Sequence, residues 1–500
     1  MGSKKRRTLF LGLSIIVLIV IVISVMTGFG PPNTHQVIPP ELFNLQYAPE
    51  YLIEDIDYML ETMESVHPDL YYYTPRDTIA RERLKLVDKL KTPMTVKEFY
   101  PLLAKFVAEF KDGHTSAIHP WEEWDAYLEN GNRIFPFELV KRGGKILVES
   151  SYLRDSEIQP GDEIVKINGK SLDSLMTIFI SEQSGEKLSY REASVLKHFD
   201  RYLWLHGIVS PFHITYLSSN TNNFQDITVS GVFYSDKLKE QESSISTSNR
   251  KYSFQFLDSG IGYLNFRSMK NLEDFKSFLE DVFTRIQHHP TSGLIIDLRK
   301  NGGGSTKLGE ELLSYITNKP YRFNSRVEWK LSPQVKEYIK GHLPVWIRWL
   351  PLHLLHPMGR KIMNTPDGKF IVWDFEPAPP RENPLRFQGP VCVLIGPHTF
   401  SSAVKLADAI KTFSIATLIG EETGGNPNAF GDIFLFDLPH THLQISVSTK
   451  RFIRANGNEE QKGGVFPDIE IIPDRAALNT GRDTVLDFAI KWVLQQAERQ

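Results

Sequence analysis

The 500-residue sequence contains one cysteine, Cys392, which excludes an internal disulfide bond. It also lacks a basic excess, because 57 Lys and Arg are set against 60 Asp and Glu, for a formal net charge of -3. Proteins that bind nucleic acid usually carry a clear positive excess, so that class is disfavoured. The glycine run ending at Gly304 continues with Ser305, without the Gly-Lys-Ser/Thr ending of a phosphate-binding loop. Nucleotide binding is therefore discounted as well.

The remaining composition supports folding into more than one domain. Hydrophobic residues make up 41% of the chain and aromatic residues 11%, which is ample for packed cores. A chain of 500 residues exceeds the usual size of a single hydrophobic core, so we expect roughly three domains.

The N-terminus has the pattern of a membrane anchor. A basic cluster, Lys4–Arg7, precedes the uncharged apolar run Leu9–Met26. As a helix this run would span about 27 Å, close to the thickness of the hydrocarbon core. We therefore predict a cytoplasmic tip and transmembrane helix over residues 1–29, with the rest of the chain outside. The alternative is a cleaved signal peptide, for which Gly28 and Gly30 give a small-residue cleavage pattern.

A proline-rich linker, residues 30–44, separates this segment from a predicted helical domain at 45–125. The clearest helix of that domain starts with Thr95 and Glu98, which form a capping box. An Asp-Gly pair is expected to end this helix and leaves His114 just beyond its C-terminus. The helix dipole would favour a protonated or hydrogen-bonded imidazole at this position. A histidine in this position can be catalytic or purely structural.

Residues 130–215 are predicted to form a β-rich domain. Its turn Pro160–Asp162 leads into a strand, and Asn168 and Gly169 form a second turn. This string resembles PDZ domains, which bind a peptide by adding it as a strand to an exposed sheet edge. The alternative is a small β-domain that acts only as a spacer.

A second core is predicted between residues 250 and 475, where strands and helices alternate. The apolar strand Gly293–Leu298 ends in a glycine loop whose uncovered N–H groups could bind an anion. Residues 333–368 form an insertion in this core, with two tryptophans that suggest a lid, a cleft wall or a membrane contact. A helix closes the chain at 480–500.

The strand Val391–Ile395 meets a Gly-Pro break, and a helical pattern begins after Ser401 and Ser402. A serine on a tight strand-to-helix turn exposes its Oγ beside the free N–H groups of the helix, which is how a nucleophile is presented. The alternative is that these hydroxyls only cap the helix.

Five motifs follow one another along the chain: DGHT at 112–115, LIIDLRKNGGG at 294–304, TFSSA at 399–403, GEETGG at 420–425 and GGVFPDI at 463–469. In this order, and with the PDZ-like string, they resemble the S41 peptidase family, which includes the tail-specific proteases and the tricorn core protease. The resemblance implies an α/β core of ClpP/crotonase-like layered βαβ units, a helical N-terminal domain and a PDZ-like domain. It also implies a serine endopeptidase that needs no metal or cofactor and acts on peptides or unfolded protein.

The resemblance also assigns the site residues. Ser401 would be the nucleophile, and the backbone N–H groups of Ser402 and Gly303 would form the oxyanion hole. His114 matches the histidine that acts as general base in the tricorn-like branch. Losing one oxyanion donor typically costs about 3–4 kcal/mol of transition-state stabilisation, so both donors matter.

Other positions bear on which branch of the family the chain resembles and on which residue orients His114. The tail-specific branch has a lysine where this chain has Asn426, so the Ser-Lys dyad is absent. Glu460 is assigned as the residue that orients His114, although Gln461 stands at the expected spacing and Glu459 is adjacent.

Three alternatives remain open on the sequence. His398, on the same turn as Ser401, is a rival base. Gly113 and Gln461 depart from the family pattern, which leaves room for an inactive S41-like module that binds peptides or apolar ligands. A lipase or esterase is the weakest alternative, because no Gly-x-Ser-x-Gly motif surrounds Ser401.

Overall fold

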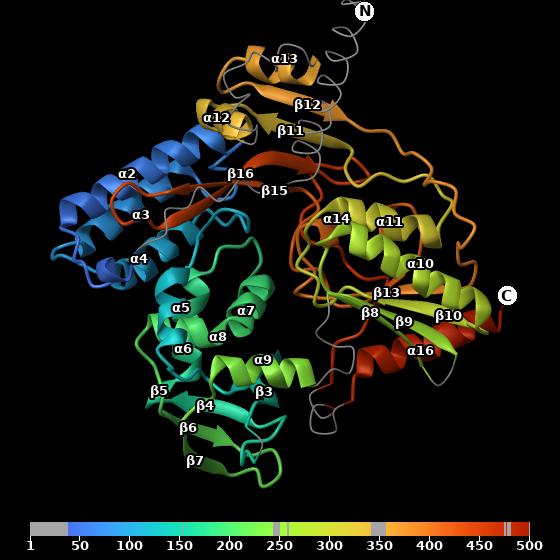
Figure 1. Cartoon of the computed structure of the whole chain (residues 1–500), viewed down its shortest axis with the longest axis horizontal. Coiled ribbons are helices and arrows are strands. Elements are labelled where there is room, and N and C mark those ends of the chain that lie inside the picture. Colours follow the sequence, from blue (N-terminus) through green and yellow to red (C-terminus); the bar gives the residue numbers. More distant parts are fainter. Residues whose placement is uncertain are drawn as a thin grey trace, which may run out of the picture. The chain divides into compact units, whose positions relative to one another are not determined.

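The computed structural model describes residues 39–153, 155–243, 251–257, 260–341, 357–474, 477 and 482–499. These residues form two compact units, each built from separate stretches of the chain (Figure 1). Unit 1 contains the chain up to His119 together with Arg326–Asp374 and Ala429–Ile453. Unit 2 contains Pro120–Ser325, Phe375–Asn428 and Arg454–Gln500.

The predicted anchor Leu9–Met26 and most of the tryptophan-rich string near residue 350 lie outside the described residues. Among the residues that are described, no helix combines the length and apolar character needed to cross a bilayer.

Unit 1 begins with a short 3-10 turn (Pro40–Leu42) and three helices that follow the predicted pattern. The first two helices are separated by a non-helical segment that contains His67-Pro68 and Pro75, as expected from proline's effect on the backbone. The predicted capping box is present, because the Glu98 N–H donates to Thr95 Oγ1 at 3.3 Å and the Thr95 N–H donates to Glu98 Oε2 at 2.9 Å. The helices are α2 (Pro49–Val66), α3 (Arg76–Lys89) and α4 (Val96–Ala108).

Helix α4 ends at Ala108, four residues before the predicted Asp-Gly stop. Lys111 adopts a left-handed conformation with φ 57°, which turns the chain away from the helix axis. The carboxylate of Asp112 then accepts the backbone N–H of His114 at 3.0 Å. His114 therefore sits in a side-chain-stabilised turn and not directly at a helix C-terminus.

The sheet of unit 1 is antiparallel, with strand order β1-β16-β11-β12 and β15 paired to β16. Its shortest strand begins two residues after His114 and pairs with β16 through Ser116 and Ser446. Helices α12 (Pro333–Gly341) and α13 (Pro357–Asn364) lie in the predicted insertion between two of the strands. The strands are β1 (Ser116–Ala117), β11 (Arg326–Lys330), β12 (Phe370–Asp374), β15 (Ala429–Asp437) and β16 (Gln444–Ile453).

The first part of unit 2 holds a second sheet, with order β2-β3-β4-β6-β7 and β5 paired to β4. Asn168 and Gly169 have φ of 47° and 77° and form the tight turn between β4 and β5, which is the geometry that an Asn-Gly pair favours. The strands are β2 (Phe137–Arg142), β3 (Lys145–Ser151), β4 (Glu163–Ile167), β5 (Lys170–Ser171), β6 (Phe212–Leu217) and β7 (Phe224–Val229).

Five helices accompany this sheet, and several contribute to one apolar core. Phe179 of α6 and Phe199 and Tyr202 of α8 are buried there against the sheet. The helices are α5 (Trp121–Glu129), α6 (Leu172–Glu182), α7 (Leu188–Lys197), α8 (Phe199–Leu205) and α9 (Tyr234–Ser243).

The second part of unit 2 is a six-stranded sheet of order β17-β14-β13-β10-β9-β8. All neighbouring pairs are parallel except β8 and β9, as the alternation of strands and helices predicts. The strands are β8 (Tyr252–Phe256), β9 (Ile261–Phe266), β10 (Gly293–Asp297), β13 (Val391–Ile395), β14 (Thr417–Gly420) and β17 (Ile469–Glu470).

Helices cover both faces of this sheet (Figure 1). Leu294 and Ile296 of β10 point into a core with α10, α11 and α14, whereas Ile295 and the cysteine of β13 face α16. The C-terminal ends of β10 and β13 lie side by side, since Asp297 pairs with Leu394. The glycine loop and the serine turn therefore start at the same sheet edge, where α/β folds usually bind ligands. The helices are α10 (Leu272–His288), α11 (Thr306–Ile316), α14 (Ser402–Thr412) and α16 (Thr484–Ala497).

Candidate active site

Ser401 has a strained backbone at the junction of β13 and α14. Its φ is 53° and its ψ is -125°, a region that residues with a side chain rarely occupy. Such a conformation costs about 1–3 kcal/mol and persists only where its surroundings enforce it. Buried Thr399 helps to enforce it, because its hydroxyl donates to the Leu298 carbonyl at 2.9 Å and accepts the Gly396 N–H at 3.1 Å. The Phe400 N–H adds a bond to the Asn301 carbonyl at 3.0 Å.

The two neighbouring serines use their hydroxyls differently. Ser401 holds the N-cap position of α14, but its side chain makes no capping hydrogen bond. Ser402 is buried, and its Oγ donates to the Gly304 carbonyl at 2.6 Å. The second hydroxyl therefore fixes the glycine loop, whereas the first is not explained by helix capping.

The glycine loop packs directly on the serine turn. Gly303 has φ of 94°, and a Cβ there would lie 2.8 Å from the Cβ of Ser401 and 2.9 Å from the Ser402 nitrogen. Gly304 has φ of 135°, and a Cβ there would lie 2.2 Å from the Met269 carbonyl oxygen. Both the conformation and the close approach require glycine at these two positions.

The two predicted oxyanion donors are in different states. The Ser402 N–H is the first of α14, where helix geometry provides no intrahelical acceptor. The Gly303 N–H donates to Asn301 Oδ1 at 2.8 Å. An oxyanion would therefore compete with Asn301 for this second donor.

Asn301 was not singled out from the sequence, although it organises the loop. It is completely buried, and its Nδ2 donates to the Phe266 carbonyl at 2.8 Å. Together with the bonds from the N–H groups of Gly303 and Phe400, this ties β9, the glycine loop and the serine turn together. An asparagine directly before a glycine run was the available signal.

His114 lies in unit 1, on the turn between α4 and β1. Its ring rests on Gly431 of β15, where a Cβ would be 3.6 Å from the ring Cε1. The ring Nδ1 is 4.0 Å from Asp112 Oδ1, and the side chain is 17% exposed. One edge of the imidazole therefore faces a carboxylate.

Asp112 is a second residue that the sequence analysis did not assign. It is 2% exposed and accepts hydrogen bonds from Thr115 Oγ1 and Ser448 Oγ, both at 2.6 Å. The His67 Nε2 lies 3.2 Å from the same carboxylate. Because the His67 Nδ1 accepts the Asp69 N–H at 3.1 Å, its Nε2 carries the proton and donates to Asp112.

The charge of Asp112 is stabilised in spite of its burial. Burial alone would raise the pKa of the carboxyl group. The hydrogen bond and electrostatic interaction with His67, the electrostatic interaction with His114 and the hydroxyl of Ser448 outweigh it and hold the pKa of Asp112 below its ordinary value. Asp112 is therefore a carboxylate over the whole physiological pH range.

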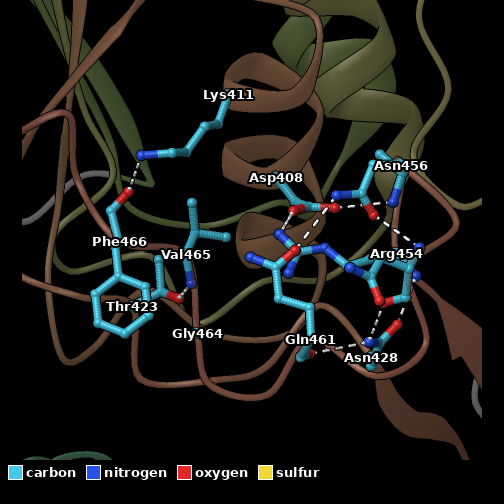
Figure 2. Close-up of polar contacts among 12 residues, drawn as sticks. Asp408, Lys411, Thr423, Asn428, Arg454, Asn456, Gln461, Gly464, Val465 and Phe466 are labelled. Atoms are coloured by element: carbon cyan, nitrogen blue, oxygen red, sulfur yellow. Dashed lines mark hydrogen bonds and ion pairs between the residues drawn. The ribbon is translucent and has the colours of Figure 1, made fainter.

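Glu460 lies in unit 2 and is exposed, with its N–H donating to Asn458 Oδ1 at 3.1 Å. Gln461, at the spacing expected for the glutamate, is part of a polar network below α14 (Figure 2). Its carbonyl accepts from Asn428 Nδ2 at 3.1 Å, and its Oε1 accepts from Asn456 Nδ2 at 3.3 Å.

The same network holds this loop to the serine-bearing helix. Buried Asp408 of α14 pairs with Arg454 and accepts the Ala455 N–H at 2.8 Å. Lys411, one turn further along α14, donates to the Phe466 carbonyl at 2.7 Å (Figure 2). The loop thus supports the helix that begins at the serine turn.

The rival base, His398, is half-buried on the serine turn. Burial and the charges of Lys197, Lys300, Arg142 and Arg267 lower the pKa of His398 to about 3. A group this weakly basic is poorly matched to proton abstraction near neutral pH.

Comparison with known proteins agrees with this architecture. Residues 260–471 match the model of Peptidase family S41. Mature CPAF complexed with lactacystin aligns with a TM-score of 0.64 and 15% identity, covering 90% of this chain and 99% of that chain. A serine-to-alanine mutant of CPAF aligns with a TM-score of 0.65 and 16% identity, covering 90% and 97%. The region 260–471 is thus similar to Peptidase family S41, within a fold similar to that of CPAF.

Proposed function

We propose that this chain is a serine endopeptidase that hydrolyses peptide bonds through an acyl-enzyme on Ser401. The observation that carries the proposal is the strained backbone of Ser401, with φ 53° and ψ -125°, at a turn where its hydroxyl does not cap the helix. The match of residues 260–471 to the S41 family and the fold similarity to CPAF support a serine peptidase.

In the proposed mechanism the Ser401 Oγ attacks the carbonyl carbon of the scissile bond while His114 accepts the hydroxyl proton. The tetrahedral oxyanion receives hydrogen bonds from the N–H groups of Ser402 and Gly303, the latter exchanging its bond with Asn301. His114 then gives the proton to the leaving amine as the C–N bond breaks. Water attacks the ester with His114 again as base, which releases the acid product and restores Ser401.

The orienting role, which the sequence assigns to Glu460, is proposed for Asp112 instead. Its carboxylate accepts the backbone N–H of His114 at 3.0 Å, and one of its oxygens lies 4.0 Å from the ring Nδ1 of the same residue. A fixed negative charge on this edge favours the tautomer with the proton on Nδ1 and leaves Nε2 as the base. The charge also stabilises the imidazolium that forms when the serine proton is taken.

The cellular setting completes the proposal. The apolar run Leu9–Met26 would anchor the chain, with the basic cluster on the cytoplasmic side and the catalytic part outside the cell membrane. The β2–β7 sheet would act as a PDZ-like module that adds a peptide to one of its edge strands. The substrates would then be peptides or unfolded protein tails.

A fluorophosphonate probe, which reacts covalently with activated serines, tests the proposed nucleophile. The folded protein should be labelled, Ser401→Ala should not be, and Ser402→Ala should keep most of the label because its backbone N–H is retained. Labelling that survives in Ser401→Ala, or that is absent from the wild-type protein, contradicts the proposal.

The second candidate is an inactive S41-like module that binds peptides or apolar ligands. The observation that favours it is the Gly303 N–H, which already donates to Asn301 Oδ1 at 2.8 Å. If this bond never opens, one oxyanion donor is missing. Peptide binding without any fluorophosphonate labelling would support this alternative.

A further inference from the structure

Helix α2 ends in a buried histidine that the proposed mechanism does not use. His67 is the C-cap of α2, with φ -66° and ψ 135°, because the proline that follows disfavours helical geometry in the residue before it. Its side chain is only 2% exposed. A buried imidazole is polar on two sides, so each ring nitrogen needs a hydrogen-bond partner. The partners of His67 therefore indicate its role.

Helix α2 is fixed to the rest of unit 1 at two points along its length. The Asp55 carboxylate accepts the Thr441 N–H at 2.9 Å and the Thr441 hydroxyl at 2.6 Å, which ties the helix to the connection between β15 and β16. Near the end of the helix, Lys330 of β11 donates to the carbonyl groups of Glu64 and His67 at 2.7 and 2.9 Å. The last turn of α2 therefore has a defined position against the sheet.

The imidazole of His67 has a defined tautomer and orientation. Its Nδ1 accepts the backbone N–H of Asp69 at 3.1 Å, so the ring proton is on Nε2. Nε2 lies 3.2 Å from Asp112 Oδ2 and donates to it. The ring also lies against Phe430 of β15, with centroids 4.6 Å apart and an interplanar angle of 49°. His67 thus presents one N–H of fixed direction to the carboxylate.

The two oxygens of Asp112 have different partners. Oδ2 accepts hydrogen bonds from His67 Nε2, Thr115 Oγ1 and Ser448 Oγ. Oδ1 accepts the backbone N–H of His114 at 3.0 Å and lies 4.0 Å from the ring Nδ1 of the same residue. A carboxylate oxygen offers about two lone-pair positions, so three donors use the full capacity of Oδ2. Oδ1 is consequently the oxygen that remains for the imidazole of His114.

Of the three donors to Oδ2, His67 is the one whose hydrogen has a fixed direction. The hydroxyl groups of Thr115 and Ser448 rotate about their C–O bonds, so they would follow a carboxylate that turned about its own side-chain bond. The ring N–H of His67 cannot follow, because the contacts described above hold the ring in place. Burial raises the pKa of Asp112, and the hydrogen bond from His67 is the largest of the contributions that lower it. His67 therefore stabilises both the charge and the orientation of this carboxylate.

We infer that His67 is a positioning residue for the general base, because it holds the Asp112 carboxylate with Oδ1 toward the Nδ1 of His114. This inference rests on the proposed function, in which His114 takes the proton of Ser401. No proton leaves His67 in this arrangement, and Asp112 stays ionised. The oriented carboxylate keeps the proton of His114 on Nδ1 and leaves its Nε2 as the base.

The tautomer of His114 can be measured without catalysis, in the full chain labelled with 15N-histidine and without substrate. Ring 15N chemical shifts distinguish a protonated from an unprotonated nitrogen, and the His114 signals are identified by their loss in His114→Asn. We expect mainly the Nδ1–H form at a pH well above the ordinary histidine pKa of about 6.5. His67→Asn should shift the population toward the Nε2–H form.

Two substitutions of His67 separate its two hydrogen bonds. His67→Asn keeps an acceptor near the position of Nδ1 for the Asp69 N–H but removes the donor to Asp112. His67→Gln places an amide N–H near the position of Nε2 and keeps that donor. The glutamine variant should therefore retain the wild-type tautomer of His114, even if both variants lose stability.

Hydrolysis of a quenched fluorescent peptide gives an independent measure. His67→Asn should lower kcat by about 10- to 100-fold with little change in KM, because the base is misplaced while the contacts with substrate are kept. The same substitution should have little further effect in the Asp112→Asn background, since a positioning residue acts only through the carboxylate. His67→Gln should restore most of the lost activity.

His206→Asn is the matched control, because it also removes a contact between a histidine Nε2 and a buried carboxylate, that of Glu182 at 3.1 Å. It should lower stability in urea unfolding without changing the His114 signals. A wild-type His114 with its proton on Nε2, an unchanged tautomer in His67→Asn, or independent losses in the double variant would overturn the inference. Absence of fluorophosphonate labelling contradicts the proposed nucleophile instead, and the tautomer measurement still decides the role of His67.

Discussion

The serine turn of unit 2 and the histidine turn of unit 1 are held in different ways. Ser401 is fixed by backbone geometry: a positive φ, a glycine loop packed against it and a buried asparagine. His114 is fixed by side chains, because Asp112 collects hydrogen bonds from residues far away in the chain. The comparison teaches that the proposed nucleophile depends mainly on local conformation, whereas the proposed base depends on tertiary polar contacts.

The largest expected effect comes from replacing the strained serine. Ser401→Gly should abolish peptide hydrolysis, by at least about 10³-fold, because the nucleophile is removed. The same change should raise the free energy of unfolding by about 1 kcal/mol, since glycine relieves the positive φ. Urea unfolding and hydrolysis of a quenched fluorescent peptide measure the two effects. An equal or lower stability would argue against stored strain at this turn.

The next largest effect is expected at the histidine turn. Asp112→Asn should lower kcat/KM by about 10²- to 10⁴-fold and move the acidic limb of its pH profile to lower pH, because the imidazolium loses a neighbouring negative charge. Ser448→Ala keeps the carboxylate and should cost stability with a smaller loss of activity.

Glu460→Gln is the matched control for this carboxylate, and its effect should be less than about threefold because the side chain is exposed. A large loss in Glu460→Gln, together with an unchanged pH profile in Asp112→Asn, would return the orienting role to Glu460.

The glycine loop should be sensitive at one position and tolerant at its neighbour. Gly303→Ala introduces a Cβ 2.8 Å from the Ser401 Cβ at φ 94°, so it should lower the free energy of unfolding by about 2 kcal/mol or more and slow hydrolysis. Gly302→Ala is the control, because a Cβ there meets no atom within 4 Å. Similar unfolding curves for the two variants would contradict the close packing of loop and turn.

The smallest effect on activity is expected for His398→Asn. The folded-state pKa of His398 is about 3 and its unfolded-state pKa is about 6.5, so the unfolded chain binds the proton first as the pH falls. The histidine therefore costs no stability above pH of about 6.5 and an increasing amount between that pH and about 3. The variant should lose less stability than the wild-type protein over this window, as measured by urea unfolding at several pH values.

Much of the fold was predictable from the sequence because neighbouring residues determine many of its helices, turns and strands. The capping box at Thr95, the Asn168-Gly169 turn and the apolar strands at β10 and β13 each follow from neighbouring residues. The predicted end of α4 was wrong by four residues. The helix stops at Ala108, and Lys111 adopts a left-handed conformation that no local sequence signal indicated.

In the candidate site, the serine turn and the glycine loop were predictable from the sequence, whereas the side-chain contacts around His114 were not. A serine between a Gly-Pro break and an amphipathic helix, and a glycine run after an apolar strand, both point to a nucleophile turn. The partners of Asp112 are His67 and Ser448, which are 45 and 336 residues away, and no spacing rule connects them. The roles of His114 and Glu460 stay predictions, to be decided by the variants above.

The most direct test of the Ser-His pairing is the rate of fluorophosphonate labelling, with the adduct mapped by mass spectrometry. We predict a single adduct on Ser401, labelled at least about 10²-fold more slowly in His114→Ala and at nearly the wild-type rate in His398→Asn. An adduct on another residue, or slow labelling in His398→Asn with normal labelling in His114→Ala, would contradict the proposed active site.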